Sequence, residues 1–220
     1  MPELHQLLMF IAAGWLLNLT PGPDVLYIVT NALKSGTRAG IVAGLGITAG
    51  CFVHIFAAAV GVSALMAASA TAFTVLKWVG AAYLVYVGSR LLLSHPPSAI
   101  KLEAAGACST GAGGQFDYQS IFLGGFWTNV LNPKVALFFL AFLPQFIAPT
   151  VENKPMAFLL LGLLFNFNGL WVNLGWALAA AWLAGRAGVV QRSMQWLDRL
   201  AGALFVTFGI KLALAQSPNT

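Results

Sequence analysis

Residues 18–24 read Asn18-Leu19-Thr20-Pro21-Gly22-Pro23-Asp24 and lie inside the first apolar segment of the chain. Two prolines and a glycine remove or weaken the backbone hydrogen bonds of a helix, and in a membrane the freed groups must be buried against protein or face a watery cavity. The stretch therefore predicts a broken helix. Pro23 suits the first position of a new half-helix capped by Thr20 or Gly22, whose free N–H groups can hold a carboxylate. A proline kink that only shapes packing is the competing interpretation, although a simple kink needs one proline.

The rest of the chain has the composition of a membrane protein. Of its 220 residues, 59% are hydrophobic and only 8% are charged, whereas soluble domains carry about 25% charged residues. No Asp, Glu, Lys or Arg occurs from Ala39 to Leu76 or from Pro155 to Gly185, and each run exceeds the ~20 apolar residues of one bilayer crossing. The composition excludes a water-soluble enzyme. The excess of basic residues is spread singly along the edges of apolar runs, which indicates membrane topology and not nucleic-acid binding.

Charges and turn residues divide the chain into six apolar segments that we interpret as transmembrane helices. They are Leu4–Leu33, Ala39–Ala67, Ala72–Leu93, Ser120–Phe146, Met156–Leu183 and Met194–Leu214. Residues 94–119 are rich in Gly, Ala, Ser and Pro, which is typical of a flexible linker. We therefore expect a three-helix unit over residues 1–93, a linker over residues 94–119, and a second three-helix unit over residues 120–220.

The two units resemble each other in sequence. The third segment contains Lys77-Trp-Val-Gly80 and ends in Gly88-Ser-Arg90, and the sixth contains Arg199-Leu-Ala-Gly202 and ends in Gly209-Ile-Lys211. The first and fourth segments both place a charge directly after a proline. A duplicated unit of three spans inserts upside down, and such inverted repeats are typical of secondary transporters, whose site lies at interrupted helices near the midplane. The predicted fold is an all-α membrane protein of six helices in two inverted repeats, with helices 1 and 4 broken at proline motifs.

The distribution of basic residues predicts the orientation in the membrane. The connections after helices one, three and five, with the start of helix six, carry Lys34, Arg38, Arg90, Lys101, Arg186, Arg192 and Arg199, while the opposite side carries Lys77, Lys154 and Lys211. The positive-rich side is expected to be cytoplasmic. The linker would then face the cytoplasm and both termini would face outward.

Asp24 is an acid in the body of an apolar segment. Lys34 follows ten residues later, so at 1.5 Å per residue Asp24 lies about 15 Å from the cytoplasmic end, near mid-membrane. A charged group there is costly and by default marks a transport pathway or a proton site. The structural alternative is an acid that complements the dipole of a half-helix, which explains the sign of the charge but not its desolvation. We therefore expect Asp24 to bind protons or a substrate ammonium.

The fourth segment holds a counterpart, Asn132-Pro133-Lys134. Asn132 can cap a half-helix that Pro133 begins, which places Lys134 in the first turn, where a cation opposes the helix dipole. Two interpretations stay open for the lysine: a structural ion pair with Asp24, or a mobile cation that meets a substrate carboxylate. The expected binding residues at the two breaks are Asn18, Thr20, Pro21, Gly22, Pro23, Asp24, Asn132, Pro133 and Lys134.

Other polar residues in the apolar segments are weaker candidates. His54 can relay protons, although a single histidine is more often packed and bonded to a carbonyl. The fifth segment carries three asparagines that either line a polar cavity or bridge helices, namely Asn166, Asn168 and Asn173. A stripe of small residues with the four-residue spacing of close helix packing comprises Gly40, Gly44 and Thr48.

Several sequence motifs of the chain resemble those of the LysE/RhtB family of amino-acid exporters. The similarity includes residues 18–24, Lys34-Ser-Gly-Thr-Arg38-Ala-Gly40, Gly80-Ala-Ala-Tyr-Leu84 and Asn132-Pro-Lys-Val-Ala-Leu-Phe-Phe-Leu-Ala-Phe-Leu-Pro-Gln145, and it covers essentially the whole chain. The resemblance implies export of amino acids or derivatives, such as homoserine, threonine, leucine, lysine or arginine, across the bacterial inner membrane against entering protons. Because Lys134 is the only basic residue at mid-membrane, a neutral amino acid is favoured.

The partners expected from this interpretation are an amino-acid substrate, protons and the lipid bilayer; a homodimer is left open, and no nucleic acid, cofactor or metal is expected. A membrane thiol-redox carrier of similar span count is the alternative function. It would require two cysteines facing each other at the helix breaks, whereas we expect Cys51 and Cys108 to lie elsewhere. An intramembrane hydrolase would require a nucleophile with a base or an H-E-x-x-H site, and neither motif occurs.

Overall fold

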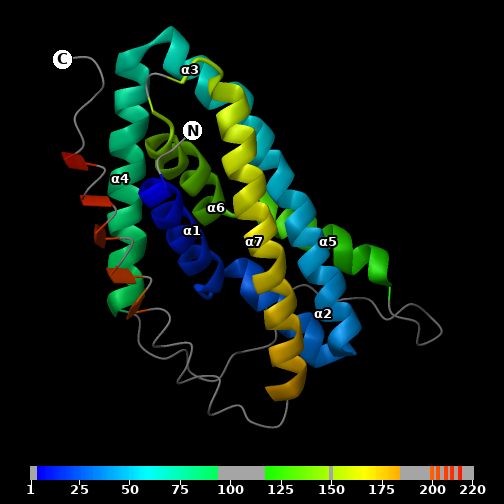
Figure 1. Cartoon of the computed structure of the whole chain (residues 1–220). Coiled ribbons are helices and arrows are strands. Elements are labelled where there is room, and N and C mark those ends of the chain that lie inside the picture. Colours follow the sequence, from blue (N-terminus) through cyan, green and yellow to red (C-terminus); the bar gives the residue numbers. More distant parts are fainter. Residues whose placement is uncertain are drawn as a thin grey trace.

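The described part of the chain is entirely helical (Figure 1). The computed structural model describes residues 4–93, 117–148 and 151–183, together with scattered positions between 199 and 214. No strand occurs among these residues. Most of the expected linker and of the expected sixth helix lies outside the described residues.

The first two helices are separated at the proline motif. Helix α1 (Leu4–Leu19) ends just before Thr20, and α2 (Pro23–Ala57) begins at Pro23 with Gly22 as its N-cap. The backbone of Gly22 is extended, and Pro23 occupies the first helical position, where its missing N–H costs no hydrogen bond.

Helix α2 contains two segments that fold back on each other at Gly36. Gly36 has φ = 82°, a left-handed conformation that glycine adopts without a Cβ clash. A Cβ on Gly40 would lie 2.7 Å from the Cβ of Ala32, although eight residues of continuous helix would separate the two positions by about 12 Å. Residues 23–35 and 37–57 therefore form a tight helical hairpin.

The remaining helices follow in chain order. A π-helical turn η1 (Ala58–Val62) and α3 (Ser63–Ala68) lead to α4 (Ala70–Leu93). Helix α5 (Tyr118–Val130) begins at the N-cap Asp117, whose side chain accepts hydrogen bonds from the N–H groups of Gln119 and Ser120. Helix α6 (Pro133–Leu137) begins at the N-cap Asn132 and continues as a π-helical turn η2 (Phe138–Phe142) and a 3₁₀ turn η3 (Leu143–Phe146). The long helix α7 spans Lys154–Leu183.

Glycines bring the second segment of α2 into close contact with α5 and α7. A Cβ on Gly46 would lie 2.1 Å from the carbonyl oxygen of Phe122, and one on Gly50 would lie 2.5 Å from that of Phe126. On the other side, Gly40 faces Ala177 and Gly44 faces Asn173, an antiparallel register with α7. Small residues let helix backbones approach closely in a membrane, and the predicted packing role of Gly40 and Gly44 is confirmed.

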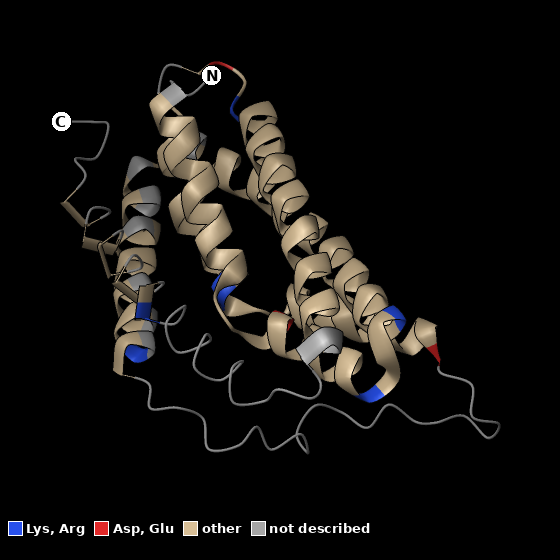
Figure 2. Cartoon of the chain, turned by 60° about the horizontal axis from the view of Figure 1, so that its bottom comes forward, with Lys and Arg blue, Asp and Glu red and all other residues tan. Residues whose placement is uncertain are grey.

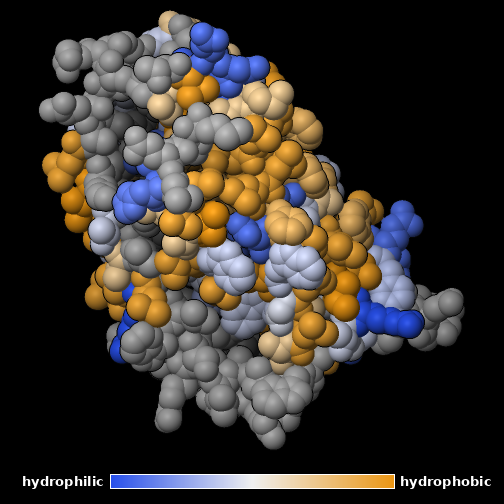
Figure 3. All heavy atoms as spheres, in the orientation of Figure 1, coloured by the Kyte–Doolittle hydropathy of each residue, from blue (hydrophilic) through white to orange (hydrophobic). Residues whose placement is uncertain are grey.

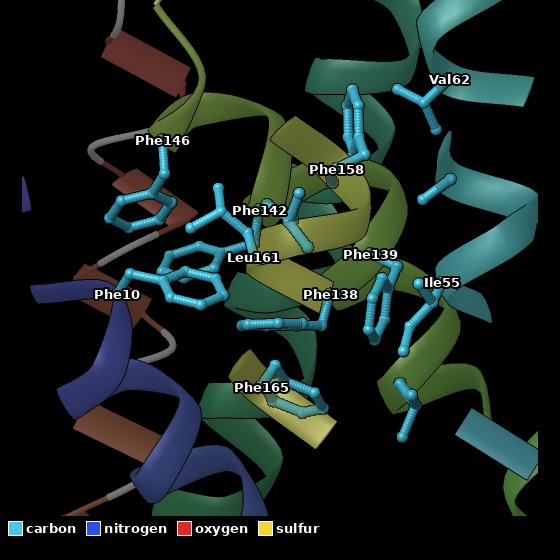
Figure 4. Packing of buried hydrophobic residues seen from close by; sticks show 14 of the residues in the cluster. Phe10, Ile55, Val62, Phe138, Phe139, Phe142, Phe146, Phe158, Leu161 and Phe165 are labelled. Carbon is cyan, nitrogen blue, oxygen red and sulfur yellow. The ribbon is translucent and has the colours of Figure 1, made fainter. Parts of the chain in front are cut away.

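A cluster of phenylalanines packs beside the two helix breaks (Figure 4). Its members come from α1, the turns after α6, and α7, and include Phe10, Phe138, Phe139, Phe142, Phe146, Phe158 and Phe165. The rings of Phe138 and Phe165 stack with centroids 4.6 Å apart. Aromatic packing of this kind joins the first half of the chain to the second. It also fixes the position of Phe165.

Much of the face seen in Figure 3 is apolar, and Figure 2 shows that few of the described residues are charged. Large side chains such as Val60, Leu93 and Phe167 are more than half exposed, while Asp24 is only 9% exposed. Among the described residues, two helices, Pro23–Leu65 and Lys154–Ala180, are long and apolar enough to cross a membrane. A third crossing results if Tyr118–Val130 and Pro133–Phe146, bent by 44°, count as one span.

Candidate functional site

A small cavity lies where the α1–α2 break meets the α5–α6 break. Its volume of about 20 Å³ holds a water molecule or two, since one water needs at least ~10–15 Å³. The lining residues are Leu17, Asn18, Asp24, Val25, Ile47, Thr48, Cys51, Asn129, Lys134, Val135, Phe165, Asn166, Gly169 and Asn173. Three of the predicted binding residues, Asn18, Asp24 and Lys134, thus face one enclosed space.

Asp24 lies in the first turn of α2 and reaches across to the end of α5. Its Oδ2 atom accepts a hydrogen bond of 3.0 Å from Asn129 Nδ2. The other carboxylate oxygen, Oδ1, is buried and has no hydrogen-bond partner among the described residues. An acceptor left in this state is costly unless a ligand, water or proton satisfies it.

Lys134 lies in the first turn of α6 and reaches across to the end of α1. Its ammonium donates to the carbonyl oxygens of Leu17 and Thr20, each at 3.1 Å, and these carbonyls belong to the last turn and end of α1. A cation at a helix C-terminus is stabilised by the helix dipole and by the free carbonyls. Lys134, which opposes the dipole of its own half-helix α6, therefore complements the dipole of α1.

Close packing holds the lysine side chain at this position. A Cβ on Gly22 would lie 3.0 Å from Lys134 Nζ and 3.5 Å from its Cε, so a side chain at residue 22 competes with the ammonium for space. The side chain of Asn132 caps α6 by accepting from the backbone N–H of Lys134 at 3.0 Å. The glycine of one break and the asparagine of the other together define where the cation sits.

The predicted proline residues and Thr20 shape the two breaks and do not line the cavity. Pro23 and Pro133 occupy the first turns of α2 and α6, and Pro21 lies in the non-helical stretch between α1 and α2. The Thr20 hydroxyl donates to Leu16 O within α1, and the Thr20 carbonyl is already bonded to Lys134. These residues set the backbone path that places Asp24 and Lys134.

Four buried polar atoms around the breaks have no hydrogen-bond partner among the described residues: Asn18 Nδ2, Asp24 Oδ1, Asn129 Oδ1 and Asn132 Nδ2. Two of them are donors and two are acceptors. Buried polar atoms are normally satisfied, so a group of four at one place indicates that something else satisfies them. A zwitterion, which carries both a donor group and an acceptor group, has the matching chemistry.

His54 occupies the position that the structural interpretation predicts. Its Nε2 atom lies 2.9 Å from the carbonyl oxygen of Asn129, and because a carbonyl only accepts, this nitrogen carries the proton. The ring stacks on Phe139 at 6.0 Å between centroids. His54 does not line the cavity, but it holds the end of α5 from which Asn129 reaches Asp24.

The asparagines of α7 differ in their positions. Asn166 and Asn173 are buried and line the cavity, and both donate to Thr48, at 3.2 Å to its carbonyl and 3.3 Å to its hydroxyl respectively. They bridge helices and face the cavity at once, so both interpretations offered for them hold. Asn168 is half-buried and lies outside the cavity lining.

Several cavity residues were not chosen as binding residues by the sequence interpretation, among them Cys51, Thr48 and Asn129. Cys51, expected to lie away from the helix breaks, lines the cavity as a buried free thiol, because the second segment of α2 runs past both breaks; Cys108 lies outside the described residues. Asn129 was quoted with its motif but not chosen as a site residue. A signal for it existed, since Asn129, like Asn18, stands a few residues before a helix-breaking proline.

This fold and cavity define a helical membrane protein with a polar interior site, and comparison with known proteins names its family. The chain matches the LysE type translocator family over residues 15–216. It belongs to that family. It is therefore a membrane translocator and not an enzyme, and the relatives give no support to a thiol-redox carrier.

Three relatives illustrate the similarity. A protein described as an uncharacterized membrane protein of Vibrio cholerae serotype O1 is 31% identical over 98% of this chain and all of its own length. The homoserine/homoserine lactone efflux protein of Salmonella typhimurium is 30% identical over 94% of this chain and 95% of its own. The leucine efflux protein of Salmonella choleraesuis is 27% identical over 90% of each chain. No solved structure matches the chain.

Proposed function

We propose that this chain exports amino acids or their derivatives from the bacterial cytoplasm as a secondary active transporter, driven by protons that enter in exchange. One observation carries the proposal: a buried acid and a lysine from two different helix breaks line one cavity, and three lining residues carry one unpartnered donor and two unpartnered acceptors among the described residues. Efflux of amino acids or their derivatives is named for two relatives that match nearly the whole chain.

The proposed architecture is six transmembrane helices in two inverted three-helix repeats. The reciprocal contacts at the breaks support it, since Lys134 reaches the end of α1 while Asp24 reaches Asn129 at the end of α5. The third and sixth predicted helices also meet through matching glycines. A Cβ on Gly88 would lie 2.7 Å from Gly202 O, and one on Gly209 would lie 2.9 Å from Ala81 O. Crossed contacts of this kind are expected of two units related by a two-fold axis in the membrane plane.

In the proposed binding mode, the substrate ammonium lies against Asp24 Oδ1 and Asn129 Oδ1, the two unpartnered acceptors. The substrate carboxylate is bound by Asn18 Nδ2 and by the Lys134 ammonium, which leaves the α1 carbonyls to meet it. Because the cavity is large enough only for water in this conformation, the helix breaks must separate before a substrate enters. The site lies within one chain, so it requires no second copy.

Proton coupling is proposed to act through Asp24. A protonated carboxyl is neutral and no longer attracts the substrate ammonium, so a proton that enters from outside releases the substrate outward. Loss of that proton to the cytoplasm restores the carboxylate for the next cycle.

The test compares two chemically identical substitutions, Asp24→Asn and Asp117→Asn, in proteoliposomes that contain labelled homoserine or leucine under an imposed pH gradient. Asp117 is exposed and caps α5, and Asn caps helices equally well, so Asp117→Asn is expected to transport normally. Asp24→Asn is expected to insert and fold but to lose transport against a concentration gradient. Uphill transport by Asp24→Asn would show that the coupling site lies elsewhere.

A further inference from the structure

His54 of α2 contacts both sides of the second helix break. Its Nε2 atom donates to the carbonyl oxygen of Asn129, at the end of α5, over 2.9 Å, and its ring stacks on Phe139 of η2 with centroids 6.0 Å apart. The imidazole is buried, and Figure 4 shows Phe139 beside Ile55, the residue that follows His54 in α2. One side chain of a continuous helix thus joins the segment before the break to the segment after it.

The carbonyl group that His54 contacts belongs to the turn of the break itself. Asn129 O also accepts a hydrogen bond of 2.9 Å from the N–H of Asn132, whose side chain caps α6 by accepting from the N–H of Lys134 at 3.0 Å. The side chain of Asn129 donates to Asp24 Oδ2 at 3.0 Å. The position of Asn129 therefore sets where the donor to Asp24 lies and where the half-helix that carries Lys134 begins.

The contact between His54 and Asn129 requires a donor but no titrating group. A carbonyl oxygen only accepts, so Nε2 keeps its hydrogen whether the ring is neutral or cationic. The titratable residues that line the adjoining cavity are Asp24 and Cys51 of α2 and Lys134 of α6, and the lining residues from α1, α5 and α7 include none. His54 itself does not line the cavity, so it reaches Asp24 only through Asn129.

We infer that His54 is a positioning residue of transport. It fixes the second helix break so that Asn129 meets Asp24, and it acts as a hydrogen-bond donor without carrying the transported proton. The inference rests on the proposed function, because it assigns a role to a residue beside that same site. It goes beyond packing, since a histidine that only fills space would not affect the proton-binding group.

Two substitutions in the full-length protein in proteoliposomes separate donation from titration. His54→Gln keeps an N–H donor but cannot titrate, whereas His54→Phe keeps an aromatic ring but has no donor. Export of labelled homoserine or leucine is expected to stay within about twofold of the parent in His54→Gln and to fall at least ~5-fold in His54→Phe. His5→Phe is the matched control, because His5 is exposed in α1, and it should export as the parent does.

The pH dependence of export distinguishes positioning from a general loss of structure. A smaller folded fraction lowers export equally at every pH. A carboxylate that loses a hydrogen-bond donor takes up a proton more readily, so the pH profile of His54→Phe is expected to shift to higher pH, while that of His54→Gln matches the parent. An unshifted profile in His54→Phe, or a profile in His54→Gln that differs from the parent, contradicts the inference.

A second measurement does not depend on how well His54→Phe folds. The chain contains three histidines, so His54 is the only one in a His5→Gln/His95→Gln background, and its ¹⁵N-labelled imidazole is observed by NMR in lipid. Nε2 is expected to stay protonated over the whole pH range in which export changes. Loss of the Nε2 proton within that range would break the bond to Asn129 and would overturn the inference.

The outcomes distinguish this inference from the proposed function. If His54→Phe exports as well as the parent, or if His54→Gln is inserted normally but is as impaired as His54→Phe, the inference is wrong and amino-acid export by the parent still stands. If the parent chain exports no amino acid, the proposed function fails and the inference fails with it.

Discussion

At the residue scale, the buried Asp24 and the half-buried Lys134 have different partners although each follows a helix-breaking proline. Asp24 is held through one oxygen by an amide, and its second oxygen is without a described partner. Lys134 is held by two main-chain carbonyls of α1. A carboxylate with a vacant acceptor can bind a proton or an ammonium, whereas an ammonium that holds two carbonyls must exchange them to bind a carboxylate. In the proposed binding mode, the lysine therefore links substrate binding to the end of α1.

Gly22→Ala tests this link. Because the Gly22 backbone is extended, alanine is conformationally acceptable, but its Cβ would lie 3.0 Å from the Lys134 ammonium. Loss of one hydrogen bond to a charged group costs roughly 1.5–3 kcal/mol, so export is expected to fall about tenfold or more. Transport in proteoliposomes is the measurement, and Gly61→Ala is the control because a Cβ there meets open space. If Gly22→Ala exports as well as the parent chain, the position of the Lys134 ammonium does not affect transport.

At the element scale, glycine contacts fix how the helices are placed side by side. The second segment of α2 lies between α5 and α7. Its glycines have no side chain, so its backbone contacts both neighbouring helices directly. In lipid the hydrophobic effect does not drive helices together, so packing and hydrogen bonds decide their register. That register brings Cys51, Thr48 and Ile47 to the cavity wall.

Gly46→Ala is expected to destabilise this packing, because its Cβ would lie 2.1 Å from the main-chain oxygen of Phe122 and one helix must move. Overpacking of this kind typically costs about 1–3 kcal/mol. Thermal unfolding in detergent is the measurement. Gly175→Ala is the matched control in α7, where a Cβ meets nothing within 4 Å, and it should be neutral or slightly stabilising because alanine is the better helix former. Equal unfolding temperatures for the two variants would contradict the contact.

At the scale of the whole molecule, the orientation follows from which end of the bundle carries the basic residues. The Gly36 turn lies beside Lys34 and Arg38. Glu152 precedes α7, and the antiparallel contacts of α2 with α7, from Gly40 with Ala177 to Gly162 with Ile55, place it at the opposite end. The positive-inside rule predicts that the turn is cytoplasmic and Glu152 external.

Cysteine labelling checks this orientation. Ser35→Cys and Glu152→Cys are introduced singly into a Cys51→Ala/Cys108→Ala background and treated in whole cells with a membrane-impermeant thiol reagent. Labelling is expected at position 152 and, only after the membrane is permeabilised, at position 35. The reverse pattern would show that the molecule has the opposite orientation and would reverse the proposed direction of proton uptake by Asp24.

The sequence alone determined the class of protein, the family resemblance and the location of the helix-breaking motifs, because hydrophobic run length, proline and glycine act locally. It also singled out Asn18, Asp24 and Lys134, which line one cavity in the structure. Only the tertiary structure decided their partners. Asp24 meets Asn129 across 105 residues and Lys134 meets Leu17 across 117, and such contacts depend on the helix register that the glycines of α2 set. For the same reason Cys51 and Thr48, which no local pattern singles out as binding residues, were found at the cavity only when the helices were in place.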